Sequence, residues 1–136
     1  TDTLCYSARI LDQLAYLASH PPHNNPNAIH DALHLYNQIS CETFCPFAAF
    51  RRHWGRAWCL WRLGDLPSAE HEGFLALESA GDGGYLRLRI MALKLLAHII
   101  TKTDPRRTAF LNRALSIATQ LKDTQLIESL RRISHG

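Results

Sequence analysis

The sequence predicts an all-α protein, one domain over residues 1–136 in which about three antiparallel helical hairpins precede a final helix, seven helices in all. Leucine and alanine dominate, and no valine occurs in the chain. Because valine is a preferred strand residue, its absence favours helices. Pro26, Pro67 and Pro105 recur at intervals of 41 and 38 residues, and apolar residues at helical spacing follow each of them. A helix pattern that recurs at about 40 residues is typical of an α-helical repeat array.

The first hairpin is expected over about residues 3–39. Leucine and isoleucine at helical spacing predict a helix over 3–19. The segment 20–26 is rich in proline and asparagine, which predicts a loop. A second helix is expected over about 27–39, where apolar residues again share one face.

The second hairpin is expected over about residues 46–79. Its first helix, 46–63, is rich in tryptophan and phenylalanine at helical spacing. Gly64 fits the end of that helix, because glycine adopts the left-handed conformation at little cost. The next helix is capped by either Ser68 or Asp65, and the sequence does not choose between them.

The third hairpin is expected over about residues 85–121. A glycine-rich turn over 81–84 precedes a helix over about 85–102. Asp104 is followed by a proline, which predicts a capped helix start there and a helix that runs to about residue 121. The final helix is expected over about 124–134, after a short break with capping residues.

Two stretches carry a family resemblance: 57–69 reads AWCLWRLGDLPSA and 74–77 reads FLAL. They resemble a tetratricopeptide repeat, which places small residues where this chain has Ala57, Ala69 and Ala76. The resemblance extends over about 44–122, although the interval here exceeds the family's roughly 34-residue period. It implies a right-handed α-α superhelix, a scaffold without enzymatic activity, and a concave groove lined by the first helix of each pair.

The expected groove is basic and contains tryptophan and arginine. These two residue types are the most enriched at binding hot spots, and they share the helix 46–63. The helix 85–102 carries a polar stripe opposite its apolar face. If the tryptophans are not core residues, this groove suits a protein or peptide, in particular an acidic one. The predicted partner-binding residues are Arg51, Trp54, Trp58, Arg62, Arg87, Lys94 and His98.

Two other kinds of partner are open. Residues 1–50 carry a net charge of −3 and residues 51–136 one of +6, so the last helices form an alternative phosphate-binding strip for nucleic acid. Its members are Arg106, Arg107, Arg113, Lys122, Arg131 and Arg132. The final helix also has an apolar face, which either packs on the preceding helix as a cap or receives a second chain.

Metal binding and membrane insertion are not expected. His30 and His34 are four residues apart, as are Cys41 and Cys45, but this spacing does not match a common zinc site. We therefore expect surface histidines, and neither a metal nor a cofactor. No apolar run approaches the roughly 20 residues that span a bilayer. We expect a cytoplasmic or nuclear protein, and a fragment of a larger one, because the chain starts at Thr1 without methionine.

Overall fold

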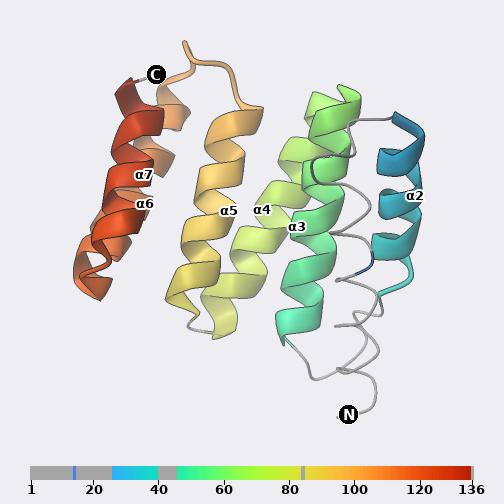
Figure 1. Cartoon of the computed structure of the whole chain (residues 1–136), viewed down its shortest axis with the longest axis horizontal. Coiled ribbons are helices and arrows are strands. Elements are labelled where there is room, and N and C mark those ends of the chain that lie inside the picture. The colour runs from blue at the N-terminus through green and yellow to red at the C-terminus, as the bar shows by residue number, and fades with distance from the viewer. Residues whose placement is uncertain (1–13, 15–25, 40–45, 84, 136) are drawn as a thin grey trace.

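The described part of the chain is helical throughout its regular structure. In this computed structural model the structure describes residue 14 and the ranges 26–39, 46–83 and 85–135. These residues form six helices and no strand, so the predicted all-α class is confirmed for them (Figure 1). The predicted first helix, over 3–19, lies outside the described residues apart from residue 14.

The helices form an array in which each one packs antiparallel against the next along the chain, and α3 also contacts α5. In Figure 1, α3, α5 and α7 lie in front, and α4 and α6 pass behind them. The order is α2 (Pro26–Asn37), α3 (Pro46–Leu63), α4 (Leu66–Gly83), α5 (Leu86–Ile99), α6 (Pro105–Leu121) and α7 (Thr124–His135).

Local chemistry fixes several helix ends. Gly64 has a φ of +89°, the left-handed conformation expected of a glycine after a helix. Asp65 accepts a hydrogen bond from the backbone N–H of Ser68 at 3.4 Å, so Asp65, and not Ser68, caps α4. Asp104 accepts one from the N–H of Arg106 at 2.9 Å, which confirms the predicted cap of α6.

Two predicted boundaries are wrong. The expected glycine-rich turn after α4 is instead helical as far as Gly83. The guanidinium of Arg89 on α5 lies 3.7 Å from where a Cβ of Gly81 would be, so this last turn of α4 packs against α5. The next helix, α5, ends at Ile99 and not near residue 102, because Ile100 takes an extended conformation and buries its side chain.

The apolar face of α7 packs inside the molecule. Leu130 is 1% exposed and belongs to a core cluster with residues of α5 and α6, including Phe110. Three partly buried α7 residues pack against the same cluster: Leu126, Ile127 and Ile133. Of the two alternatives for this helix, the structure therefore shows the cap on the preceding helix. Self-association through it stays untested.

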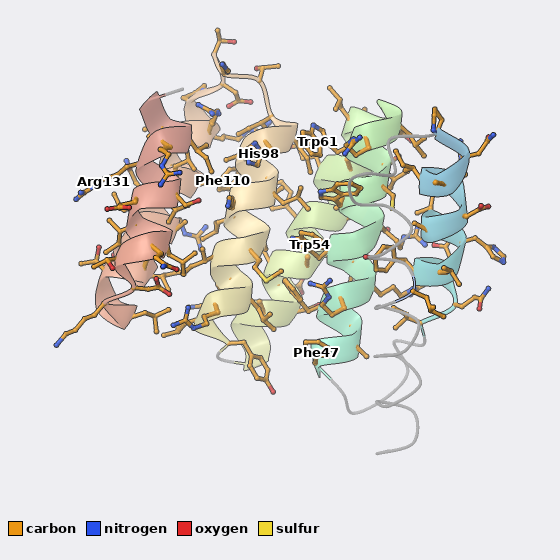
Figure 2. All side chains as sticks on the ribbon, viewed as in Figure 1. Phe47, Trp54, Trp61, His98, Phe110 and Arg131 are labelled. Atoms are coloured by element: carbon orange, nitrogen blue, oxygen red, sulfur yellow. The ribbon has the colours of Figure 1, made fainter. Side chains whose placement is uncertain are left out.

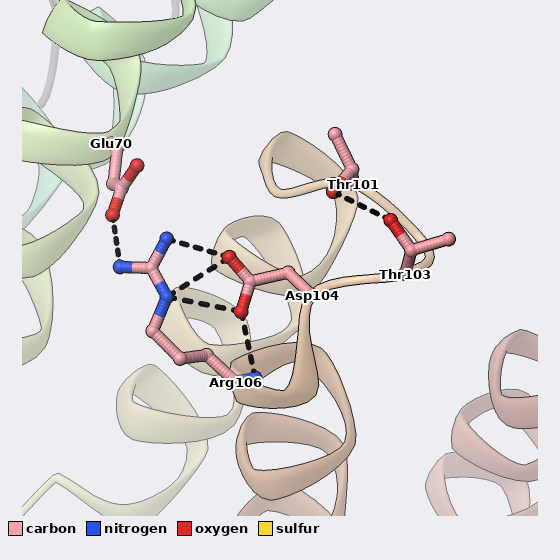
Figure 3. A network of polar contacts seen from close by, with 5 residues as sticks. All are labelled: Glu70, Thr101, Thr103, Asp104 and Arg106. Atoms are coloured by element: carbon pink, nitrogen blue, oxygen red, sulfur yellow. Dashed lines mark hydrogen bonds and ion pairs between the residues drawn. The ribbon is translucent and has the colours of Figure 1, made fainter.

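A polar network holds the start of α6 against α4 (Figure 3). The guanidinium of Arg106 donates to both carboxylate oxygens of Asp104 and forms an ion pair with Glu70 of α4. The hydrogen bonds from the side chain and backbone of Arg106 lower the pKa of the Asp104 carboxyl below its ordinary value. One arginine thereby links α4 to the start of α6, beside the loop that connects α5 and α6.

Candidate functional site

All the formal charge on the two central front helices, α3 and α5, is positive. Their sequences contain no aspartate or glutamate, whereas α4 behind them contains no lysine or arginine. Of the positive charges on α3 and α5, those of Arg62, Arg87 and Lys94 lie on the front of the array, where an acidic partner is attracted. The basic residues of α3 and α5 are Arg51, Arg52, Arg56, Arg62, Arg87, Arg89 and Lys94. The acidic residues of α4 are Glu70, Glu72, Glu78 and Asp82.

An aromatic pair bridges α3 and α5 at the ends of the two helices (Figure 2). The rings of Trp61 and His98 are stacked, with centroids 5.8 Å apart and planes inclined by 28°. His98 is exposed and Trp61 is half-buried, so the pair has a surface that a partner can reach. Trp61 was absent from the predicted binding residues, although it lies seven residues, two helical turns, after Trp54 and so on the same side of α3.

The imidazole of His98 is neutral at physiological pH. Partial burial and then the positive charges of Lys94 and Arg107 lower its pKa from the ordinary value of 6.5. A neutral ring stacked on an indole offers a flat surface and a hydrogen-bonding nitrogen, and no additional charge. The charge on this face therefore comes from its arginine and lysine residues.

His98 gives the protein a predicted pH response. With a folded-state pKa below 6.5, the unfolded chain takes up the proton first, so the contribution of His98 to stability is full above pH 6.5. That contribution is lost as the pH falls from 6.5 through the folded-state pKa. We expect an NMR titration of the His98 ring to give a pKa below that of an unfolded peptide. In thermal melts at pH 7.5 and 5, His98→Gln should reduce the pH dependence; an unchanged difference would contradict the prediction.

Arg87 and Lys94 extend the surface from α5 toward α7. The side chain of Arg87 is 61% exposed, and its Nη1 lies 2.7 Å from Oδ2 of Asp123, just before α7. The ammonium of Lys94 donates to the hydroxyl of Ser129 on α7 at 3.2 Å. The seven-residue spacing between them places both cations on one side of α5, which agrees with the predicted polar stripe.

The four predicted residues on α3 divide into buried and accessible ones. Arg51 and Trp58 are only 8% and 9% exposed, and Trp58 belongs to a core cluster. Each buried residue forms a cation–π contact with a more accessible one. The guanidinium of Arg51 lies 4.8 Å from the ring centre of Trp54, and the guanidinium of Arg62 lies 4.9 Å from the ring centre of Trp58. Arg51 and Trp58 therefore support the surface, and Trp54 and Arg62 present it.

We call this surface the basic–aromatic face. It consists of the accessible members of the predicted set together with the tryptophan that the prediction omitted. Its residues are Trp54, Trp61, Arg62, Arg87, Lys94 and His98. The face runs from α3 across α5 and is linked to α7 by polar contacts.

A second polar cluster joins three helices away from this face. The carboxylate of Glu72, 9% exposed, lies 2.7 Å from Nδ1 of His53 and 3.1 Å from Nε of Arg56. Arg56 also donates to the side-chain oxygen of Asn37 on α2. Burial alone would raise the pKa of Glu72, but the hydrogen bond with His53 and the charges of Arg56 and the neighbouring histidines together lower it. The cluster connects α2, α3 and α4.

Half of the predicted phosphate-binding strip is engaged in internal contacts. Arg106 and Arg132 form ion pairs, the latter with Glu128 at 3.8 Å. The guanidinium of Arg107 donates to the carbonyl oxygens of Ala97 and Ile133. Within the described part of the chain, the strip retains three cations that form no ion pair: Arg113, Lys122 and Arg131.

The histidine and cysteine candidates do not converge where the structure describes them. His30 and His34 are both exposed on α2, whereas Cys41 and Cys45 lie outside the described residues. Among the described residues no group of three or more histidine, cysteine, aspartate or glutamate side chains is arranged to hold a metal. Burial raises the pKa of the free thiol of Cys59 to about 12, so this cysteine is protonated and unreactive.

No helix in the described ranges is long and apolar enough to cross a membrane. No protein-family model, curated protein or solved structure matches the chain. What the protein does is therefore inferred from the basic–aromatic face itself, the surface on which charge, aromatic side chains and exposure coincide.

Proposed function

We propose that this protein is an interaction scaffold without enzymatic activity, which binds an acidic segment of a protein partner on the basic–aromatic face. The observation that carries the proposal is the absence of acidic residues from α3 and α5, which contribute three cations, Arg62, Arg87 and Lys94, to the face. Electrostatic complementarity of this kind accelerates encounter and excludes basic partners. The stacked Trp61 and His98 add an aromatic surface of the type found at hot spots.

The array of hairpins supports a scaffold role. We further propose that the hairpins continue the tetratricopeptide-like pattern as a right-handed superhelix, with α3, α5 and α7 on its concave side. A surface built from packed helices is already ordered, so binding requires little reorganisation. The buried free thiol of Cys59 is compatible with the reducing cytoplasm or nucleus, where we place the protein.

The His53–Glu72 pair supports a structural role for the polar cluster. A histidine–carboxylate pair is also a component of many catalytic sites, but here Glu72 is shared with Arg56, which in turn contacts Asn37 of α2. The arrangement stabilises the packing of three helices. Nucleic-acid binding receives less support, since half of the proposed strip is held in internal contacts.

Charge reversal on the face should weaken binding of acidic segments. We expect Arg62→Glu and Lys94→Glu each to weaken binding of fluorescein-labelled acidic 15-residue peptides by about tenfold, since each replaces an attraction with a repulsion of similar size. Fluorescence anisotropy measures the affinity, and circular dichroism verifies the fold. Arg113→Glu on α6 is the matched control, with the same charge change at an exposed site behind the face.

The control variant should bind as the wild type does. Equal losses for Arg113→Glu and Lys94→Glu would show that only net charge matters and would contradict a localised site. The same conclusion would follow if basic peptides of matched length bound the wild type as tightly as acidic ones.

A further inference from the structure

An apolar pocket lies at the edge of the array where α3 and α5 begin and α6 ends. It is a shallow depression, open to solvent, with a volume of about 490 Å³. Tyr85, just before α5, is 44% exposed and is one of the few large apolar side chains on the described surface. We call this site the Tyr85 pocket. It is lined by Phe47, Tyr85, Leu86, Arg87, Leu88 and Leu121.

Arg87 places a positive charge at the pocket. Among the described residues that line the pocket, it is the one that is charged, and its side chain is 61% exposed. The ion pair with Asp123 joins Nη1 to one carboxylate oxygen, whereas a guanidinium carries five N–H donors. Arg87 can therefore receive a second carboxylate from a bound molecule while its contact with Asp123 persists.

We propose that the Tyr85 pocket receives an apolar side chain of the partner segment, and that a carboxylate next to that side chain pairs with Arg87. The occupant is thus an acidic protein segment with an aromatic or large aliphatic residue beside an aspartate or glutamate. Charge complementarity selects this occupant, because Arg87 carries the charge of the lining and its single contact with Asp123 leaves further guanidinium donors for a partner carboxylate. The proposal rests on the proposed function and adds a specificity-determining site to it.

The position of the pocket sets the length of the segment. Phe47 and Trp61 lie 14 residues apart on α3, which at a rise of about 1.5 Å per residue separates them by about 21 Å. Figure 2 shows them near opposite ends of the helix. An extended segment advances about 3.3 Å per residue, so roughly six residues reach from the pocket to the Trp61–His98 pair.

Three short peptides test the site on the full chain by ¹H–¹⁵N NMR titration. The probe is acetyl-Glu-Phe-Glu-amide; acetyl-Gln-Phe-Gln-amide lacks the carboxylates, and acetyl-Glu-Ala-Glu-amide lacks the apolar side chain. We expect the probe to shift the amide signals of Tyr85, Arg87 and Leu88, and to bind about fivefold more tightly than either control, the effect of one modest interaction. Probe shifts confined to Trp61 and His98, or equal affinities of all three peptides, would overturn the proposal.

Two variants of one ion pair separate the effect of the Arg87 charge on binding from any effect on the fold. Both Arg87→Gln and Asp123→Asn break the Arg87–Asp123 contact, but only the first removes the positive charge at the pocket. Asparagine remains a good helix cap, so Asp123→Asn should leave α7 intact. We expect Arg87→Gln to remove the preference for the acidic probe over its glutamine analogue and Asp123→Asn to retain or increase it. Parallel losses in both variants would contradict a direct role for Arg87.

The titration also distinguishes this proposal from the one on which it rests. If the 15-residue acidic peptides bind and respond to Lys94→Glu while the three-residue probe leaves the pocket unperturbed, the basic–aromatic face stands and the Tyr85 pocket fails. If neither kind of peptide binds, both proposals fail.

Discussion

Gly55→Ala is expected to destabilise the protein by about 2 kcal/mol, a net effect after any gain in helix propensity. A Cβ on Gly55 would lie closer than 3.0 Å to ring carbons of Tyr36, which real Cβ atoms essentially never do. Tyr36 of α2 is fully buried, so its ring has nowhere to move without disturbing the core. Urea unfolding followed by circular dichroism measures the change.

Gly81→Ala is the matched control. A Cβ there meets its nearest neighbour, the guanidinium of Arg89, at 3.7 Å, an ordinary contact. Because alanine favours the helix over glycine by up to about 1 kcal/mol, this variant should be as stable as the wild type or more stable. If Gly55→Ala also left the stability unchanged, the close packing of Tyr36 of α2 on Gly55 of α3 would be contradicted.

Glu72→Ala is expected to cost about 2 kcal/mol at neutral pH, because it leaves His53 and Arg56 without their shared carboxylate. Both partners retain some exposure, 19% and 28%, so the loss falls below that for a fully buried pair. Glu78→Ala on the same helix removes an exposed carboxylate and should change stability by less than about 0.5 kcal/mol.

The loss at Glu72 should depend on pH in a defined direction. Its folded-state pKa lies below the ordinary 4.5, so the unfolded chain takes up the proton first as the pH falls. The stabilisation is therefore full above pH 4.5 and declines as the pH falls from there through the folded-state pKa. Unfolding of the wild type and of Glu72→Ala at pH 7 and pH 3.5 should show a smaller difference at the lower pH. A difference independent of pH would assign the loss to packing alone.

Local signals in the sequence predicted most helix boundaries. A glycine, an aspartate followed by proline, and apolar residues at helical spacing are short-range features, and the observed ends of α3, α6 and α7 follow them closely. The extension of α4 to Gly83 was missed because the helix continues through residues of low helix propensity. Glycine content alone favours a turn there.

The residue types of the candidate site could be predicted from the sequence, whereas their burial and their contacts could not. The periodicity of α3 and α5 shows which residues share a side, but Arg51 and Trp58 are buried by packing that periodicity does not reveal. The Trp61–His98 pair depends on how far α3 and α5 are shifted along their axes. Residues at the ends of three helices line the Tyr85 pocket, so no single stretch of sequence predicts it.

We propose that the basic–aromatic face selects an acidic protein partner. The most direct measurement is affinity purification of the protein from nuclease-treated extract of its source cells, with quantitative mass spectrometry of what is retained. Wild type and Arg113→Glu should retain the same proteins through acidic segments, and the double variant Arg62→Glu/Lys94→Glu should lose them. Retention of the same proteins by the double variant, or their recovery by the wild type only from extract that has not been treated with nuclease, would contradict this role.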